Sequence, residues 1–94
     1  MNRILKHITN EMFTSDLDYV NIKNGNYRVV RDSRKNYFIK HYYYGNLICF
    51  VDLTENYFQL HNCGYEKHSL TTAQLNYLEK FYCEKGYTLD YRGY

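Results

Sequence analysis

Residues 27–44 hold the side chains best suited to binding chemistry. One acid, Asp32, accompanies a run of cations and rings: Arg28, Arg31, Arg34, Lys35 and Lys40, interleaved with Tyr37, Phe38, Tyr42, Tyr43 and Tyr44. Cations that meet phosphates, together with rings that stack on bases, are typical of surfaces that bind single-stranded nucleic acid. Tyr and Arg are also the residues most enriched at protein interfaces. A third interpretation is that alternate rings form a core while the charges line a solvated face.

We expect partner binding to involve seven residues of this stretch. They combine guanidinium or ammonium groups with phenol rings: Arg31, Arg34, Lys35, Tyr37, Tyr42, Tyr43 and Tyr44. A phenol ring offers a large apolar area and a polar tip, so it suits either class of partner. The stretch therefore predicts a binding surface for a protein or for a nucleic acid.

The same stretch contains the residue types of a small metal-independent ribonuclease. Such an enzyme needs one or two His, a cation and a Tyr, and the chain offers His41, Lys40 and Arg34, with His61 further along. A phosphate-cradling loop is missing, because the five Gly are isolated at turns or ends. No catalytic pair stands out among the ten scattered acids. These absences favour a protein that is not an enzyme.

A second cluster of reactive types comprises His61, Cys63 and His68, with Cys83 as a distant fourth member. Structural zinc usually takes four ligands in paired knuckles, and only one such knuckle is visible here. Cys63 with His61 or His68 could also form a nucleophile and base, but no orienting residue or oxyanion hole is evident. We interpret the cluster as polar loop residues and expect no metal and no cofactor.

Composition limits the chain to one small domain, residues 1–94. It has 13 Tyr and 5 Phe but no Pro and no Trp, and its abundance of residues with AT-rich codons indicates a low-GC genome. The net charge of +2 is too small to imply nucleic acid by itself. Residues 1–40 carry eight cations and four acids, net +4, and residues 41–94 carry four and six, net −2. The charge distribution is therefore dipolar.

The apolar runs of the chain are too short or too interrupted to predict a signal peptide or a membrane span. Polar residues break the N-terminal stretch after Arg3 and Lys6, so it does not match a signal peptide. The densest apolar run, residues 47–51, is far shorter than the ~20 residues that span a bilayer. We expect a cytoplasmic protein without membrane contact. Its three Cys, an odd number, then read as reduced thiols.

Hydrophobic periodicity assigns the elements of the first two-thirds of the chain. Residues 2–13 place apolar side chains at helical spacing, which predicts a short amphipathic helix. Residues 17–30 are predicted to form a first hairpin, which turns at Asn24-Gly25. Residues 37–44 and 47–53 are predicted to form a second hairpin, which turns at Gly45-Asn46, and residues 57–61 are predicted to form a further strand. Apolar residues on both faces of 47–53 predict a central strand covered on two sides.

The last third carries a helix start signal. Thr71 as N-cap and Gln74 at N3 form a capping box, and Leu70 can pack against Leu75. Gly86 is the natural residue after the last turn, and residues 87–91 form an edge strand or a tail. The predicted fold is therefore α+β: an N-terminal helix, an antiparallel β-meander of about five strands, a C-terminal helix packed on the sheet and a possible final edge strand.

A resemblance to known proteins rests on residues 37–82. The order Tyr42-Tyr43-Tyr44-Gly45-Asn46-Leu47-Ile48, then Asp52, Tyr65 and Ser69, with Thr71 and Thr72 opening a helix, resembles small uncharacterised proteins of Firmicute phages. In those proteins a β-meander ends in an S-x-T-T helix start. The resemblance brings no catalytic residues. It implies an origin in a phage or mobile element, where small single-domain proteins frequently inhibit host machinery, as anti-CRISPR proteins do.

The leading hypothesis is a non-enzymatic interaction protein that inhibits a host defence complex by binding and steric occlusion. A CRISPR nuclease complex is the expected kind of partner, bound through a Tyr-rich face rather than by DNA mimicry, because the chain carries +2. The alternatives are a nucleic-acid-binding module, single-strand or regulatory, and a small metal-independent ribonuclease.

Overall fold

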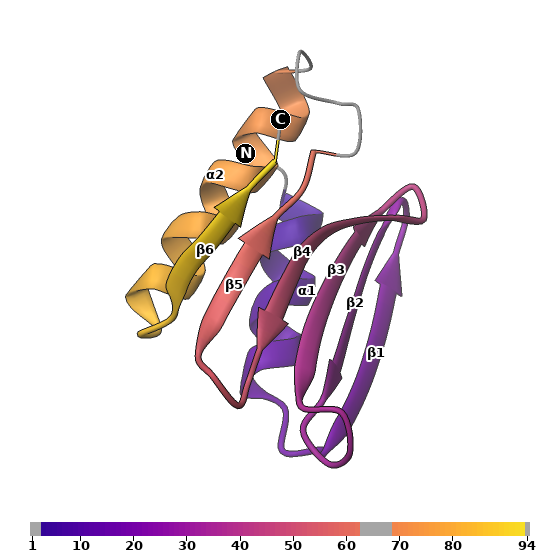
Figure 1. Cartoon of the computed structure of the whole chain (residues 1–94). Helices are drawn as coiled ribbons and strands as arrows, with labels where there is room; N and C mark the ends of the chain where they lie inside the picture. Colours follow the sequence, from indigo (N-terminus) through magenta and orange to yellow (C-terminus); the bar gives the residue numbers. More distant parts are fainter. Residues whose placement is uncertain (1–2, 63–68, 94) are drawn as a thin grey trace.

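The computed structural model describes residues 3–62 and 69–93, which form an α+β fold (Figure 1). The elements are α1 Arg3–Thr14, β1 Tyr19–Asn24, β2 Tyr27–Asp32, β3 Phe38–Tyr43, β4 Asn46–Asp52, β5 Tyr57–Leu60, α2 Ser69–Glu84 and β6 Thr88–Arg92. The predicted fold class is confirmed. The N-terminal helix, the antiparallel meander, the C-terminal helix on the sheet and the final edge strand are all present.

The strands of the described residues form one six-stranded sheet in the order β1-β2-β3-β4-β5-β6. Neighbours from β1 to β5 are antiparallel. The last strand, β6, pairs parallel to β5, because the chain crosses back along α2 before it rejoins the sheet. A parallel neighbour needs such a crossover, and a helix is its usual form. The C-terminal helix and strand therefore close the sheet as one β-α-β unit.

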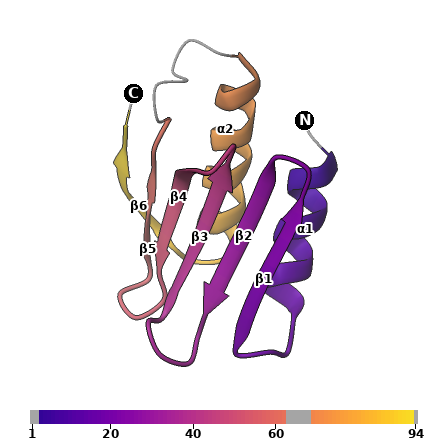
Figure 2. The ribbon, with the colours of Figure 1, turned by 90° about the vertical axis from the view of Figure 1, so that its right-hand side faces the viewer.

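Both helices lie on the same side of the sheet (Figure 2). Helix α1 packs on β1 and β2, and α2 packs on β4, β5 and β6. The apolar stripe of α1 is buried as predicted, through Leu5, Ile8 and Met12. Opposite it lie inward-facing strand residues such as Val29, Ile39 and Val51, and α2 adds Leu75, Leu78, Phe81 and Tyr82. One core therefore fills the space between the helices and a single sheet face.

The two tight hairpins have the predicted places, but each turn is shifted by one residue. Gly25-Asn26 connects β1 to β2, with positive φ at Gly25 only, as in a type II′ turn. Tyr44-Gly45 connects β3 to β4, and both residues have positive φ, 50° and 77°, as in a type I′ turn. The observed register places Ile22 opposite Val29 on the helix-covered side.

The prediction that residues 47–53 are covered on two sides is wrong. The helices cover one face only, and Phe50, on the other face, is half-buried. A register shift beside His41 and Tyr42 also separates Leu47 from Cys49. Leu47 pairs with Tyr42 and Cys49 pairs with His41, so the two side chains face opposite sides. Cys49 itself is the buried small hydrophobe that the sequence indicates.

Helix α2 begins at Ser69, two residues before the predicted N-cap Thr71, which lies inside the helix. A capping box contributes only about 1 kcal/mol, so tertiary packing can shift a helix start by a turn or less.

The described part of the chain contains no helix of the length and apolar character needed to cross a bilayer.

Candidate functional site

The side of the sheet opposite the helices forms the candidate site, which we call the open face. Strand side chains alternate between two faces, and the register brings alternate residues of neighbouring strands together. The open face includes the rings and cations Tyr19, Lys23, Arg28, Phe38, Lys40, Tyr42, Phe50 and Tyr57, the apolar Val30 and Leu47, and the acids Asp32 and Asp52. No described helix covers it (Figures 1 and 2). Rings and cations therefore share one uncovered surface on neighbouring strands.

Two cations of the open face, Arg28 and Lys40, lie over aromatic rings. The guanidinium of Arg28 lies 5.3 Å from the ring centroid of Tyr42, a cross-strand neighbour. The ammonium of Lys40 lies 4.4 Å from the ring of Phe38, on the same strand. Such contacts contribute about 0.5–1 kcal/mol at exposed sites. They hold the positive groups against the sheet.

The β2–β3 loop extends this surface at one end of the sheet. The guanidinium of Arg34 lies 5.8 Å from the ring of Tyr19, at the start of β1. Asp32 shapes the loop, because its carboxylate accepts hydrogen bonds from the backbone N–H of Lys35 and Arg34 and from the side chain of Asn36. These hydrogen bonds lower the pKa of Asp32, and the bond from the Lys35 backbone N–H is the largest cause. The carboxylate is therefore used within the loop, while Arg34 and Lys35 are exposed.

A pocket of about 380 Å³ lies at the other end of the open face, between the β1–β2 and β3–β4 turns. Lys23, Arg28, Tyr42 and Tyr44 contribute to its lining, and the described lining residues include no acid. Tyr44 is 60% exposed at the tip of its turn. The open face therefore carries Lys23 and Arg28 at this pocket and Lys40 in its middle, with Asp32 and Asp52 at the end near the β2–β3 loop.

Five of the seven predicted partner-binding residues lie on or beside the open face. Tyr42 is on it, Arg34, Lys35 and Tyr37 lie in the loop at one end, and Tyr44 lies at the other. Tyr37 has a φ of 54° and is 48% exposed, so the loop turns its ring toward solvent. The seven predicted residues mark this neighbourhood but do not include Arg28, Phe50 or Tyr57. Their signal was the period-two spacing along each strand.

The other two predicted residues, Arg31 and Tyr43, face the helix-covered side and are not part of the open face. The guanidinium of Arg31 donates hydrogen bonds to the carbonyls of Met12 (2.7 Å) and Ser15 (2.9 Å) and to that of Leu17. It thus satisfies carbonyls left open at the end of α1. Tyr43 stacks on Tyr27, with centroids 4.9 Å apart. Each residue is one position away from an open-face neighbour, and that offset reverses its side.

The residues proposed for a ribonuclease do not converge. Lys40 lies on the open face, whereas His41 is buried under α2, where its Nε2 lies 2.5 Å from the hydroxyl oxygen of Tyr82. Burial lowers the pKa of His41 to about 3, so its ring is neutral at physiological pH. His61 lies beyond β5, with its ring against Tyr91. A buried, neutral His41 has no path to act on RNA in solvent.

The cluster of possible metal ligands is only partly within the described structure. Cys63 and His68 lie outside the described residues. His61 Nε2 lies 3.3 Å from the side-chain oxygen of Gln59, and Cys83 is exposed on α2. In residues 3–62 and 69–93 no three His, Cys, Asp or Glu side chains group as a metal site would require.

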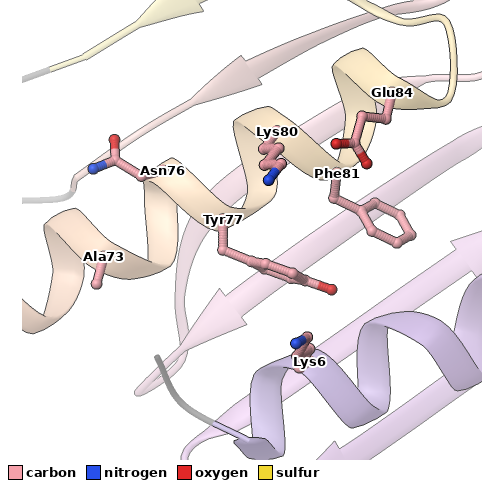
Figure 3. Close-up of a pocket in the computed structure, with 7 residues that line it drawn as sticks. All are labelled: Lys6, Ala73, Asn76, Tyr77, Lys80, Phe81 and Glu84. Atoms are coloured by element: carbon pink, nitrogen blue, oxygen red, sulfur yellow. The ribbon is translucent and has the colours of Figure 1, made fainter.

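A second concave surface, which we call the helix groove, lies between α1 and α2 on the opposite side of the molecule (Figure 3). It has a volume of about 650 Å³. Its lining includes Lys6 from α1, with Ala73, Tyr77, Lys80, Phe81 and Glu84 from α2. The ring of Tyr77 points from α2 across the groove toward α1 (Figure 3). Burial, and to a lesser extent Glu84, raises the pKa of Tyr77.

Comparison with protein-family models, curated proteins and solved structures finds no match for this chain.

Proposed function

We propose that this protein is a non-enzymatic interaction protein that binds a large partner through its open face. The supporting observation is the row of cation-capped rings on a sheet face that no described helix covers. Phenol rings and guanidinium groups are the side chains that carry most binding energy at protein interfaces. The molecule measures 36 × 28 × 21 Å, so one broad face matches the ~800 Å² that each partner contributes to a standard interface.

The partner on this proposal presents an acidic surface. Asp32 and Asp52 both accept hydrogen bonds from backbone amides of the turns that follow them, whereas Arg28 and Lys40 lie over rings in the middle of the face. Opposite charges across an interface speed association and exclude partners of the wrong sign. The central cations are therefore expected to select the partner.

The partner class that we propose is an effector of a host defence system, such as a CRISPR nuclease complex, in the host cytoplasm. Support comes from the resemblance of residues 37–82 to phage proteins and from the low-GC composition. A 94-residue protein seated on an effector surface inhibits by occupying space that a substrate or a moving domain requires. This mode needs no catalytic residue.

The test is co-purification with candidate effectors together with phage survival on defended cells. The double variant Arg28→Glu/Lys40→Glu reverses charge on the open face. The matched control Arg3→Glu/Lys6→Glu makes the same change on α1, where both side chains are exposed. We expect the first variant to lose effector binding and phage protection and the control to keep both. Equal behaviour of the two variants, or no binding by the wild type, would reject the proposal.

A second candidate, a single-strand nucleic-acid-binding module, is favoured by one specific observation. Phe38, Tyr42 and Phe50 lie on neighbouring strands of an uncovered antiparallel sheet beside Arg28 and Lys40. Aromatic side chains on a sheet surface stack bases, and adjacent cations contact the phosphates. This function predicts oligonucleotide binding that weakens steeply as salt rises and is lost in Arg28→Glu/Lys40→Glu. Salt-insensitive binding, or none, would exclude it.

A further inference from the structure

The helix groove lies on the side of the molecule that the proposed function does not use. Its two banks come from α1 and α2, which cover different strands of the sheet. Lys6 stands on the α1 bank, and Ala73, Tyr77 and Phe81 follow one another along α2 at helical spacing (Figure 3). Residues three or four apart share one helix face, so these three side chains form a continuous apolar wall.

The size of the helix groove suits a small molecule. Its volume of about 650 Å³ lies within the ~300–1,000 Å³ typical of ligand pockets. An α-helix of three turns, about 10 Å wide and 16 Å long, would fill about 1,300 Å³, roughly twice that space. A partner helix is therefore too large to be seated within this groove.

The charges of the helix groove favour an anion. Lys6 and Lys80 stand on opposite banks, and neither forms an ion pair within the described part of the chain. Glu84 is the one acid among the described lining residues, and it stands next to Phe81, toward the end of α2 (Figure 3). Lys6 thus faces Tyr77 from α1, Lys80 lies between Tyr77 and Glu84 along α2, and the two cations outnumber the one described acid of the lining.

Tyr77 adds a hydrogen-bond donor to these charges. Its ring crosses the groove, and its hydroxyl is on the side of Lys6 (Figure 3). Because burial and Glu84 raise the pKa of Tyr77, the hydroxyl keeps its proton at neutral pH and can donate to an anion. Two ammonium groups and one phenol together match a carboxylate, which has two oxygens and accepts several hydrogen bonds.

We propose that the helix groove is a binding site for a small amphipathic carboxylate. The carboxylate lies between Lys6 and Lys80 and accepts a hydrogen bond from the Tyr77 hydroxyl. The apolar body of the ligand, an aromatic ring system or a short acyl chain, lies along Ala73, Tyr77 and Phe81. This site is independent of the open face and does not rest on the proposed function.

The experiment compares two fluorescent probes on the full chain. 1-Anilinonaphthalene-8-sulfonate carries an apolar body and one negative charge, and N-phenyl-1-naphthylamine has nearly the same body without the charge. We expect Lys6→Gln/Lys80→Gln to lower the affinity for the anionic probe at least about tenfold and to change the affinity for the neutral probe less than about twofold. The matched control is Arg3→Gln/Lys85→Gln, which removes one exposed cation from α1 and one just after α2, both outside the described lining of the groove, and should change neither. 2-Naphthoate, the carboxylate itself, should displace the anionic probe.

A second variant tests the location. Ala73→Phe places a large side chain in the groove without removing any core residue. The affinity for both probes should therefore fall at least about tenfold, while the thermal unfolding midpoint stays near that of the wild type. If Ala73→Phe unfolds, NMR shifts of the wild type on adding 2-naphthoate give the location, and they should centre on Ala73 and Tyr77. Probe binding that survives Ala73→Phe, shifts centred elsewhere, or equal loss of both probes in Lys6→Gln/Lys80→Gln would overturn the proposal.

Discussion

The two faces of strand β3 treat polar side chains in opposite ways. On the open face Lys40 is charged and lies over the ring of Phe38. On the helix-covered face the next residue, His41, is buried and neutral and contacts the hydroxyl of Tyr82. At these two positions of β3 the open face holds a charged group at the solvent boundary, and the core holds a neutral ring with a hydroxyl partner. Adjacent residues of one strand therefore divide between the proposed binding surface and the core.

Other polar contacts repeat this difference. Within the core, the amide of Gln74 donates to the hydroxyl of Tyr27 at 2.6 Å, and the hydroxyl of Thr9 donates to the carbonyl of Leu5 at 2.7 Å. On the open face, Arg28 combines a ring contact with a 3.2 Å hydrogen bond to Asn21 in solvent. Interactions that replace water inside the core contribute more to stability than those that solvent can replace. Substitutions on the two faces should therefore differ sharply in their cost.

The largest expected effect is on a ring of the helix-covered side. Tyr82→Ala removes a fully buried side chain that contacts Phe58, Phe81 and His41. We expect a loss of about 3–5 kcal/mol in the free energy of unfolding, because the cavity adds to the lost burial. Tyr42→Ala, on the half-buried open face, is the control and should cost far less. Urea unfolding followed by circular dichroism measures both, and similar losses would remove the distinction between the faces.

The next effect depends on pH through His41. Its pKa in the folded protein, about 3, lies below the ordinary value of 6.5, so the unfolded chain binds a proton in that interval and the folded chain does not. The stability from the neutral ring is thus complete above pH 6.5 and declines as the pH falls toward 3. The nearby Tyr82 and Cys49 have raised pKa values and stay neutral throughout this interval.

Lowering the pH from 7.5 to 5.0 should therefore cost about 2 kcal/mol through His41. Urea unfolding of the wild type and of His41→Gln at both pH values isolates this contribution, since the carboxylates act equally in the two proteins. The wild type should lose about 2 kcal/mol more than the variant. The same pH dependence in both proteins would show that His41 is hydrated in the folded state.

A smaller effect on stability is expected for Arg31, a predicted partner-binding residue that donates hydrogen bonds to backbone carbonyls near the end of α1. Arg31→Met keeps much of the apolar stem but removes the donors to the carbonyls of Met12 and Ser15. We expect a loss of about 1–2 kcal/mol in the free energy of unfolding, because those carbonyls lose a charged donor but can partly turn to water. Lys35→Met, in the exposed β2–β3 loop, is the matched control and should change stability little. If Arg31→Met left the free energy of unfolding unchanged, Arg31 would again be a candidate binding residue.

The sequence was sufficient for the elements but not for the side of the sheet on which each residue lies. Helical spacing in α1 and the two hairpins are local patterns, so they were predictable. Arg28 and Arg31 are chemically alike, and their odd spacing on β2 puts them on opposite faces, but which face is covered depends on where α1 packs. Likewise, the register shift beside Tyr42 depends on pairing with β4. The helix groove was not predictable, because it depends on the separation of two helices that are far apart in the chain.

The smallest effect on stability should coincide with the largest effect on binding. Arg28→Gln/Lys40→Gln removes two charges from the open face while keeping polar side chains of similar reach, and we expect the free energy of unfolding to change by less than about 1 kcal/mol. Partner capture should nevertheless fall, because on the proposed function the central cations select the partner. Unfolding in urea and effector pull-down of the same variant measure the two quantities. A variant that lost both together would show that the ring contacts hold the sheet rather than the partner, and the functional division between the faces of β3 would then be wrong.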